Sequence, residues 1–89
     1  MAYYKIEWDA KAKKGFNSLD NSVKLRVEKY LKKIVRAKNQ RDFGKRLTRN
    51  LVKYWRYRVG DYRIIVEILD DKLIILIIDI DHRKEIYDE

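Results

Sequence analysis

Two segments rich in aromatic and β-branched residues, 53–59 and 62–69, are separated only by Gly60-Asp61. A two-residue connection with Gly at its first central position is typical of a tight β-hairpin. Such a hairpin fixes the pairing of its strands, so residues whose numbers sum to 121 lie opposite one another. The sequence therefore predicts an antiparallel strand pair with a defined register.

Two further strands are predicted on either side of this hairpin in the chain. After a polar turn at 70–72, residues 73–80 carry the longest apolar run, which suits a strand in the interior of a sheet. Near the N-terminus, residues 3–8 alternate and place Tyr4, Ile6 and Trp8 on one face.

Two helices are predicted between the first strand and the hairpin. Asp9 is a suitable N-cap for a helix that ends near Leu19, with Ala12 and Phe16 on its apolar side. A second helix, capped by Asp20 or Asn21, shows an apolar stripe at helical spacing, formed by Val23, Val27, Tyr30, Leu31 and Ile34. The connection between the two helices is short, so they form a helical hairpin.

The order strand, helix, helix and three strands predicts an α+β domain. The helices pack on one face of a mostly antiparallel sheet whose last three strands form a meander. A length of 89 residues fits one domain, 1–89, and residues 38–50 are expected to form a loop. The chain shows neither a signal peptide nor an apolar run near the roughly 20 residues of a membrane helix, which indicates a cytoplasmic protein without a membrane partner.

The residue content restricts the chemistry. The chain has no Cys and one His, which excludes disulfides and thiolate chemistry and argues against a metal site. We therefore expect no metal and no cofactor. Catalysis would depend on Arg, Lys, Tyr, Asp, Glu or the single His.

Positive charge is concentrated in the middle of the chain. Residues 36–63 contain ten basic and two acidic side chains, so this segment carries the whole net charge of +8. A concentrated basic patch is typical of proteins that bind a polyanion. The alternative is a charged segment that only aids solubility.

The predicted hairpin register gathers three arginines on one face. Arg58 lies opposite Arg63, and Arg56 shares their side of the sheet, whereas Tyr57 faces the core. Like charges directly opposite one another destabilise a sheet, so an anionic ligand between them is the simplest explanation. Arginine is well suited to phosphate because its planar guanidinium donates two parallel hydrogen bonds. The alternative is that these are ordinary surface residues on a solvated face.

The C-terminal segment adds three candidate residues. His82, Arg83 and Tyr87 follow the interior strand directly, and we expect that strand to deliver them beside the hairpin arginines. His82 alone is compatible with a structural role, and Tyr87 could simply anchor the tail.

Two segments of this sequence resemble signature segments of the RelE/ParE toxin superfamily. They are Trp55-Arg56-Tyr57-Arg58-Val59-Gly60-Asp61-Tyr62-Arg63-Ile64-Ile65 and His82-Arg83-Lys84-Glu85-Ile86-Tyr87. The predicted order of elements also matches that family over nearly the whole chain. The resemblance is greatest to RelE-like mRNA interferases of type II toxin–antitoxin systems.

This resemblance implies a toxin that enters the ribosome, cuts messenger RNA in the A site and is silenced by a RelB-like antitoxin. It implies a metal-independent endoribonuclease, in which a ribose 2′-hydroxyl attacks the neighbouring phosphate. Arg63 and Arg83 would bind the scissile phosphate, Arg56 and Arg58 would hold the messenger and assist proton transfer, and Tyr87 would stack on a base or activate the nucleophile. Basic residues of the loop and of the start of the hairpin would bind RNA, namely Lys45, Arg46, Arg49 and Lys53.

The sequence departs from the family pattern in two places. Thr48 follows Leu47 where relatives usually have Gly, and arginines stand at 56 and 58 where the best-studied RelE-like enzymes carry lysines. An arginine is a poor base, so the general base remains open between Tyr87 and His82. The alternative functions are a ParE-like inhibitor of DNA gyrase and an inactive, RNA-binding member of the family.

Overall fold

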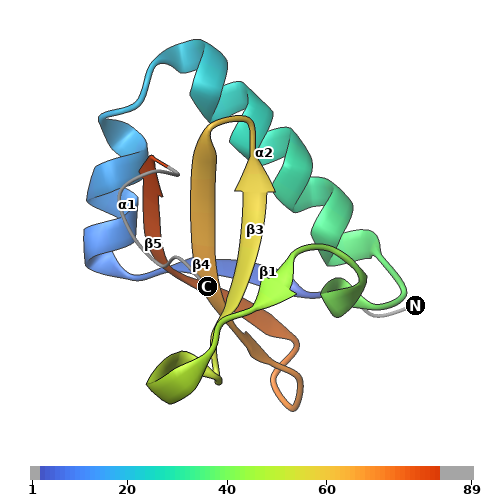
Figure 1. Ribbon diagram of the computed structural model, residues 1–89. Coiled ribbons are helices and arrows are strands. Elements are labelled where there is room, and N and C mark those ends of the chain that lie inside the picture. Colours follow the sequence, from blue (N-terminus) through green and yellow to red (C-terminus); the bar gives the residue numbers. More distant parts are fainter. Residues whose placement is uncertain (1–2, 83–89) are drawn as a thin grey trace.

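The computed structural model describes residues 3–82 and shows two helices beside one five-stranded sheet (Figure 1). Two short 3-10 turns, η1 and η2, lie between α2 and β3. In chain order the elements are β1 (Lys5–Trp8), α1 (Ala10–Asn17), α2 (Asn21–Arg36), η1 (Gln40–Asp42), β2 (Lys45–Arg46), η2 (Arg49–Leu51), β3 (Trp55–Val59), β4 (Tyr62–Leu69) and β5 (Ile74–His82).

The strands lie in the order β1-β5-β4-β3-β2. β5 pairs in parallel with β1 and antiparallel with β4, while β3 pairs antiparallel with β4 and β2. The predicted α+β class, the meander and the interior position of the last strand are confirmed. The hairpin register is also as predicted, with Tyr57 opposite Ile64 and Arg58 opposite Arg63.

Both helices cover one face of the sheet, and Figure 1 looks onto the opposite face. The predicted apolar sides of both helices are confirmed, since Phe16, Val27 and Ile34 are buried against Tyr57 and Ile77. In the first helix the Asp9 carboxylate accepts a hydrogen bond from the Lys11 backbone N–H at 3.1 Å, as expected of an N-cap. No helix within residues 3–82 is both long and apolar enough to span a bilayer.

The segment 38–50 is more ordered than the predicted loop, because it contains η1, β2 and the start of η2. Gln40 explains part of this order: its buried side-chain amide donates to the carbonyls of Ile34 and Ala37, where α2 ends. Gly44 then has φ +75°, and a Cβ there would overlap the carbonyl oxygen of Arg56. Only glycine lets this backbone approach β3 so closely, and β2 pairs with β3 directly afterwards.

A β-bulge in β5 changes which side chains face the core. Val66 pairs with Ile77 but Ile65 pairs with Asp79, so Ile78 is the extra residue. Before the bulge Ile77 points into the core, and after it Ile80 does. The bulge therefore determines the faces of the last residues of β5.

Candidate active site on the arginine face

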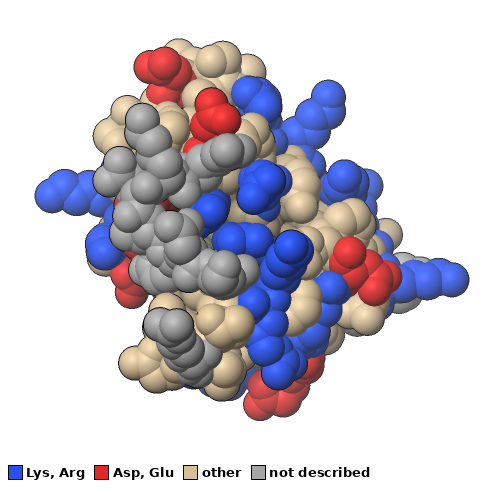
Figure 2. Space-filling model, viewed as in Figure 1, with Lys and Arg blue, Asp and Glu red and all other residues tan. Residues whose placement is uncertain are grey.

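The face of the sheet opposite the helices carries the three hairpin arginines, as the register predicts. Arg58 lies directly opposite Arg63, and Arg56 lies opposite Ile65. On the edge strand, Lys45 lies opposite Arg56 and adds a fourth basic side chain. We call this surface the arginine face, after Arg56, Arg58 and Arg63. Figure 2 shows Lys and Arg side chains gathered in a band across it.

The arginine face is less exposed than the alternative of ordinary surface residues on a solvated face would require. Arg56 and Arg63 are each only 8% exposed, while Arg58 is exposed. Leu47 and Ile65 are almost completely buried, yet they are not part of the core beneath the helices. Ile65 lies opposite Arg56, and a buried apolar neighbour lowers the local dielectric constant and strengthens the attraction of a guanidinium group for an anion.

Two carboxylates share this face, and sequence reasoning missed them. Arg63 lies opposite Asp81, and Ile65 lies opposite Asp79. Asp79 is buried with its Oδ2 atom 3.7 Å from Nζ of Lys11, and Oδ1 of Asp81 accepts a hydrogen bond from the His82 backbone N–H at 2.7 Å. Simple alternation from Ile75 and Ile77 would have placed both aspartates in the core, so only the bulge reveals them.

His82 lies on the other face, so the expectation that β5 delivers it beside the hairpin arginines is wrong. It pairs with Tyr62, and their rings meet edge to face at 5.4 Å between centroids. The two rings line a cavity of about 500 Å³ against α1, beside Lys14 and Leu19. Within the described chain, the buried Nδ1 atom of His82 has no hydrogen-bond partner. The bulge is again the cause, because one extra residue exchanges the two faces.

The other predicted site residues fall in several places. Arg83 and Tyr87 lie outside the described residues. Arg49 belongs to η2. Residues 3–82 contain no group of three or more His, Asp or Glu side chains that could hold a metal ion.

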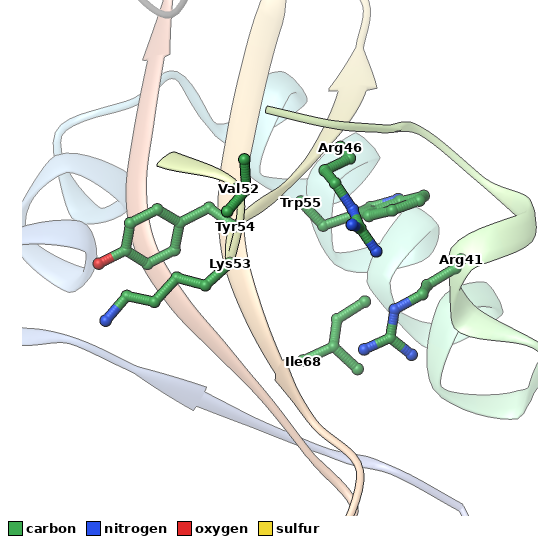
Figure 3. A pocket seen from close by; sticks show the side chains of 7 residues that line it. All are labelled: Arg41, Arg46, Val52, Lys53, Tyr54, Trp55 and Ile68. Carbon is green, nitrogen blue, oxygen red and sulfur yellow. The ribbon is translucent and has the colours of Figure 1, made fainter. Parts of the chain in front are cut away.

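Arg46 and Lys53 line a separate pocket, at the end of the sheet beyond the C-terminus of α2 (Figure 3). Arg46 lies opposite Trp55, so it is on the helix-bearing side rather than on the arginine face. In Figure 3 the guanidinium groups of Arg41 and Arg46 approach the same space, beside the Trp55 ring and Ile68. Arg41 lies in the basic segment 36–63, but it is not among the residues predicted to bind RNA.

Comparison with known proteins identifies the family. The sequence pattern that defines the ParE toxin of parDE type II toxin–antitoxin systems matches residues 6–87. The chain belongs to this toxin family. As a toxin of a type II toxin–antitoxin system, it is a member of the RelE/ParE superfamily that the two signature segments indicated. No curated protein sequence matches it.

Solved structures show that the ParE-family toxin has a RelE-like fold. The RelBE2 toxin–antitoxin complex from Mycobacterium tuberculosis is similar with a TM-score of 0.82 and 24% identity, over 96% of this chain and 97% of the other. The isolated E. coli RelE toxin is similar with a TM-score of 0.73 and 19% identity, over 91% of this chain and 84% of the other. The Staphylococcus aureus YoeB dimer is similar with a TM-score of 0.71 and 22% identity, over 91% of this chain and 98% of the other.

Proposed function

We propose that this toxin is a ribosome-dependent mRNA endoribonuclease that cuts the messenger in the A site. The observation that carries the proposal is the arginine face: two buried arginines and one exposed arginine share one side of a β-hairpin, with Arg58 directly opposite Arg63. The positive charges of Arg58 and Arg63 repel each other, and a phosphate bound between their guanidinium groups would offset that repulsion.

The proposed reaction is attack of a ribose 2′-oxygen on the adjacent phosphorus. The bond to the 5′-oxygen breaks, and the products are a 2′,3′-cyclic phosphate and a 5′-hydroxyl. Negative charge rises on the phosphate oxygens in the transition state, where Arg63 and Arg83 would stabilise it. An arginine supplied to a phosphoryl transition state accelerates the reaction by about 10³- to 10⁵-fold. The burial of Arg63 supports this role, because electrostatic stabilisation is strongest where water is excluded.

A proton must leave the 2′-hydroxyl and another must reach the 5′-oxygen. His82 is a poor candidate for these steps, because it lies on the helix side of the sheet with Tyr62. We therefore assign proton transfer to Tyr87, with Arg56 and Arg58 holding the messenger. Lys45, opposite Arg56 on the edge strand, extends the RNA-binding surface.

We also propose a RelB-like antitoxin as the partner. The solved E. coli RelBE structure is of a toxin–antitoxin complex of this fold. The basic side chains of the arginine face suit an acidic, partly disordered segment that folds on binding. Co-expression of a small acidic protein encoded beside the toxin should restore growth and yield a complex that weakens at high salt.

The test is to induce the toxin in bacteria and map the 5′ ends of messenger RNA. The wild type should arrest growth and produce codon-phased ends, and the Arg63→Ala, Arg83→Ala double variant should do neither. Because Arg63 is buried, Arg63→Lys is the milder variant; it keeps the charge but loses the two parallel hydrogen bonds, and cutting should fall about 10- to 100-fold. Arg36→Gln, at the exposed end of α2, is the matched control.

The result also separates the alternatives. Growth arrest without new RNA ends, together with loss of DNA supercoiling activity, would replace this proposal with gyrase inhibition. A folded wild-type protein that neither arrests growth nor cuts RNA would be an inactive, RNA-binding member of the family.

A further inference from the structure

The pocket at the end of the sheet lies on the side opposite the arginine face. It is lined by Arg41, Arg46, Val52, Lys53, Tyr54, Trp55 and Ile68. We call it the end pocket. Arg46 and Trp55 are cross-strand partners, and Arg41 reaches the pocket from η1 (Figure 3). None of these residues belongs to the three-arginine cluster proposed above.

The end pocket carries positive charge that the carboxylates of residues 3–82 do not fully neutralise. Arg41 is paired with Asp70, Nη1 to Oδ2 at 3.1 Å, and the hydrogen bond from the Tyr4 hydroxyl at 2.6 Å lowers the pKa of that carboxyl. Asp70 therefore stays ionised and balances Arg41 alone. Neither Arg46 nor Lys53 forms an ion pair with any residue in the described part of the chain. Among the described residues, the guanidinium groups of Arg41 and Arg46 thus carry two positive charges, and only one carboxylate, that of Asp70, balances them.

The shape and remaining lining indicate the kind of anion. The Trp55 ring is held in place because its Nε1–H donates to the carbonyl of Phe43, and Ile68 adds an apolar wall. An indole beside arginines provides a stacking surface for a nucleobase as well as hydrogen-bond donors for a phosphate. The volume of about 160 Å³ is below the roughly 300 Å³ at which small-molecule sites begin. The pocket is therefore too small to enclose a whole free ligand, and it suits a unit of a polymer of which only a part enters the pocket.

The edge strand connects this pocket to the arginine face. β2 is only two residues long: Lys45 faces the arginine face opposite Arg56, and Arg46 faces the end pocket opposite Trp55. A polyanion that contacts Arg56 and Lys45 would meet Arg46 on passing around this short edge.

We propose that the end pocket binds a nucleotide of the RNA strand outside the cut bond, with its phosphate at Arg46 and Arg41 and its base against Trp55. This proposal rests on the proposed function, because it assumes that the strand on the arginine face is RNA. The pairing of two arginines with a fixed indole favours a nucleotide over an acidic protein side chain, which would leave the ring without a partner.

The test uses the indole N–H signals of the two tryptophans in nitrogen–proton correlation NMR spectra of the intact protein. Trp55 reports on the end pocket, and Trp8, which packs on Phe16 at 4.8 Å between ring centroids, is an internal reference. Titration with single-stranded hexauridylate should shift the Trp55 signal in a saturable way and leave Trp8 unchanged. Arg46→Gln should weaken this binding about tenfold, and the slope of log affinity against log salt should fall by about 0.7, as expected for one lost phosphate contact. Arg36→Gln should behave as the wild type.

Several outcomes would overturn the proposal. They are an unmoved Trp55 signal at millimolar RNA, equal binding by Arg46→Gln and wild type, or a Trp55 shift with a glutamate-rich peptide but not with RNA. An unchanged Trp8 signal and an unchanged circular dichroism spectrum of the free Arg46→Gln protein verify that the fold is intact. If RNA binds as described but the wild type makes no cuts on ribosomes, the cleavage assignment fails and the nucleotide site stands. If the wild type cuts RNA on ribosomes but the Trp55 signal does not respond to RNA, the nucleotide site fails and the cleavage assignment stands.

Discussion

Tyr57 holds the strand that bears the arginines, and removing its hydroxyl should reveal how. Tyr57 stands between Arg56 and Arg58 in the chain, and its side chain is fully buried. Its hydroxyl donates a hydrogen bond to the carbonyl of Gln40 at 2.8 Å. Tyr57→Phe keeps the ring and leaves that carbonyl without its donor. At pH 7 the free energy of unfolding should fall by about 1–2 kcal/mol, and the melting temperature should fall by about 4–8 °C per kcal/mol.

The effect should depend on pH with a definite sign. Burial, aided by the nearby Tyr30, raises the pKa of Tyr57 well above its ordinary value of about 10. Above pH 10 the unfolded chain ionises at this tyrosine while the folded chain does not. The contribution of Tyr57 to stability is therefore complete below about pH 10 and falls by about 1.4 kcal/mol per pH unit above it. Phe has no such loss, so the difference between the two proteins should shrink to about zero near pH 11.

Urea unfolding followed by circular dichroism at pH 7, 9, 10 and 11 measures this difference. Tyr4 and Tyr30, whose pKa values are also raised, are present in both proteins, so their ionisation largely cancels in the subtraction. A difference that stays constant from pH 7 to 11 would contradict the assignment of a buried, neutral Tyr57. Equal stability at pH 7 would contradict the hydrogen bond to Gln40.

Three further substitutions test the description of the fold and of the site. Gly44→Ala should lower the free energy of unfolding by at least about 1–3 kcal/mol, measured by urea unfolding, because φ is +75° and the new Cβ overlaps the carbonyl of Arg56; near-wild-type stability would show that β2 does not approach β3 so closely. His82→Gln should leave ribosome-dependent cutting within about tenfold of wild type, whereas Tyr87→Phe should reduce it by about 10²- to 10⁴-fold. The reverse order, measured as rates on stalled ribosomes, would return the proton-transfer role to His82.

The hairpin and the helices could be predicted from the sequence because their signals are local. Gly60-Asp61 determines the pairing of Arg58 with Arg63 without reference to any other element. The apolar residues of both helices recur at helical spacing, and these are the residues that the structure buries. Each of these features depends on residues close together in the chain.

The bulge, β2 and the end pocket could not be predicted, because each depends on contacts between distant segments. Ile78 has nothing that distinguishes it from its apolar neighbours, and only pairing with β4 makes it the extra residue. Gly44 reads as a loop breaker, but its conformation serves an approach to Arg56 on another strand. The end pocket combines η1, β2, residues 52–54, the start of β3 and Ile68 of β4, so no short motif describes it.

The extra residue at Ile78 makes the identity of the site depend on length as well as on residue type. If Ile78 instead paired with Ile65, the register would run unbroken and residues 79–82 would exchange sides of the sheet. The imidazole of His82 would then lie with Arg63, and the carboxylate of Asp81 would face α1. A gapless alignment of β5 with a relative that lacks the extra residue would thus compare side chains from opposite surfaces of the sheet. Assignments of catalytic residues in this family should therefore follow strand pairing rather than residue order.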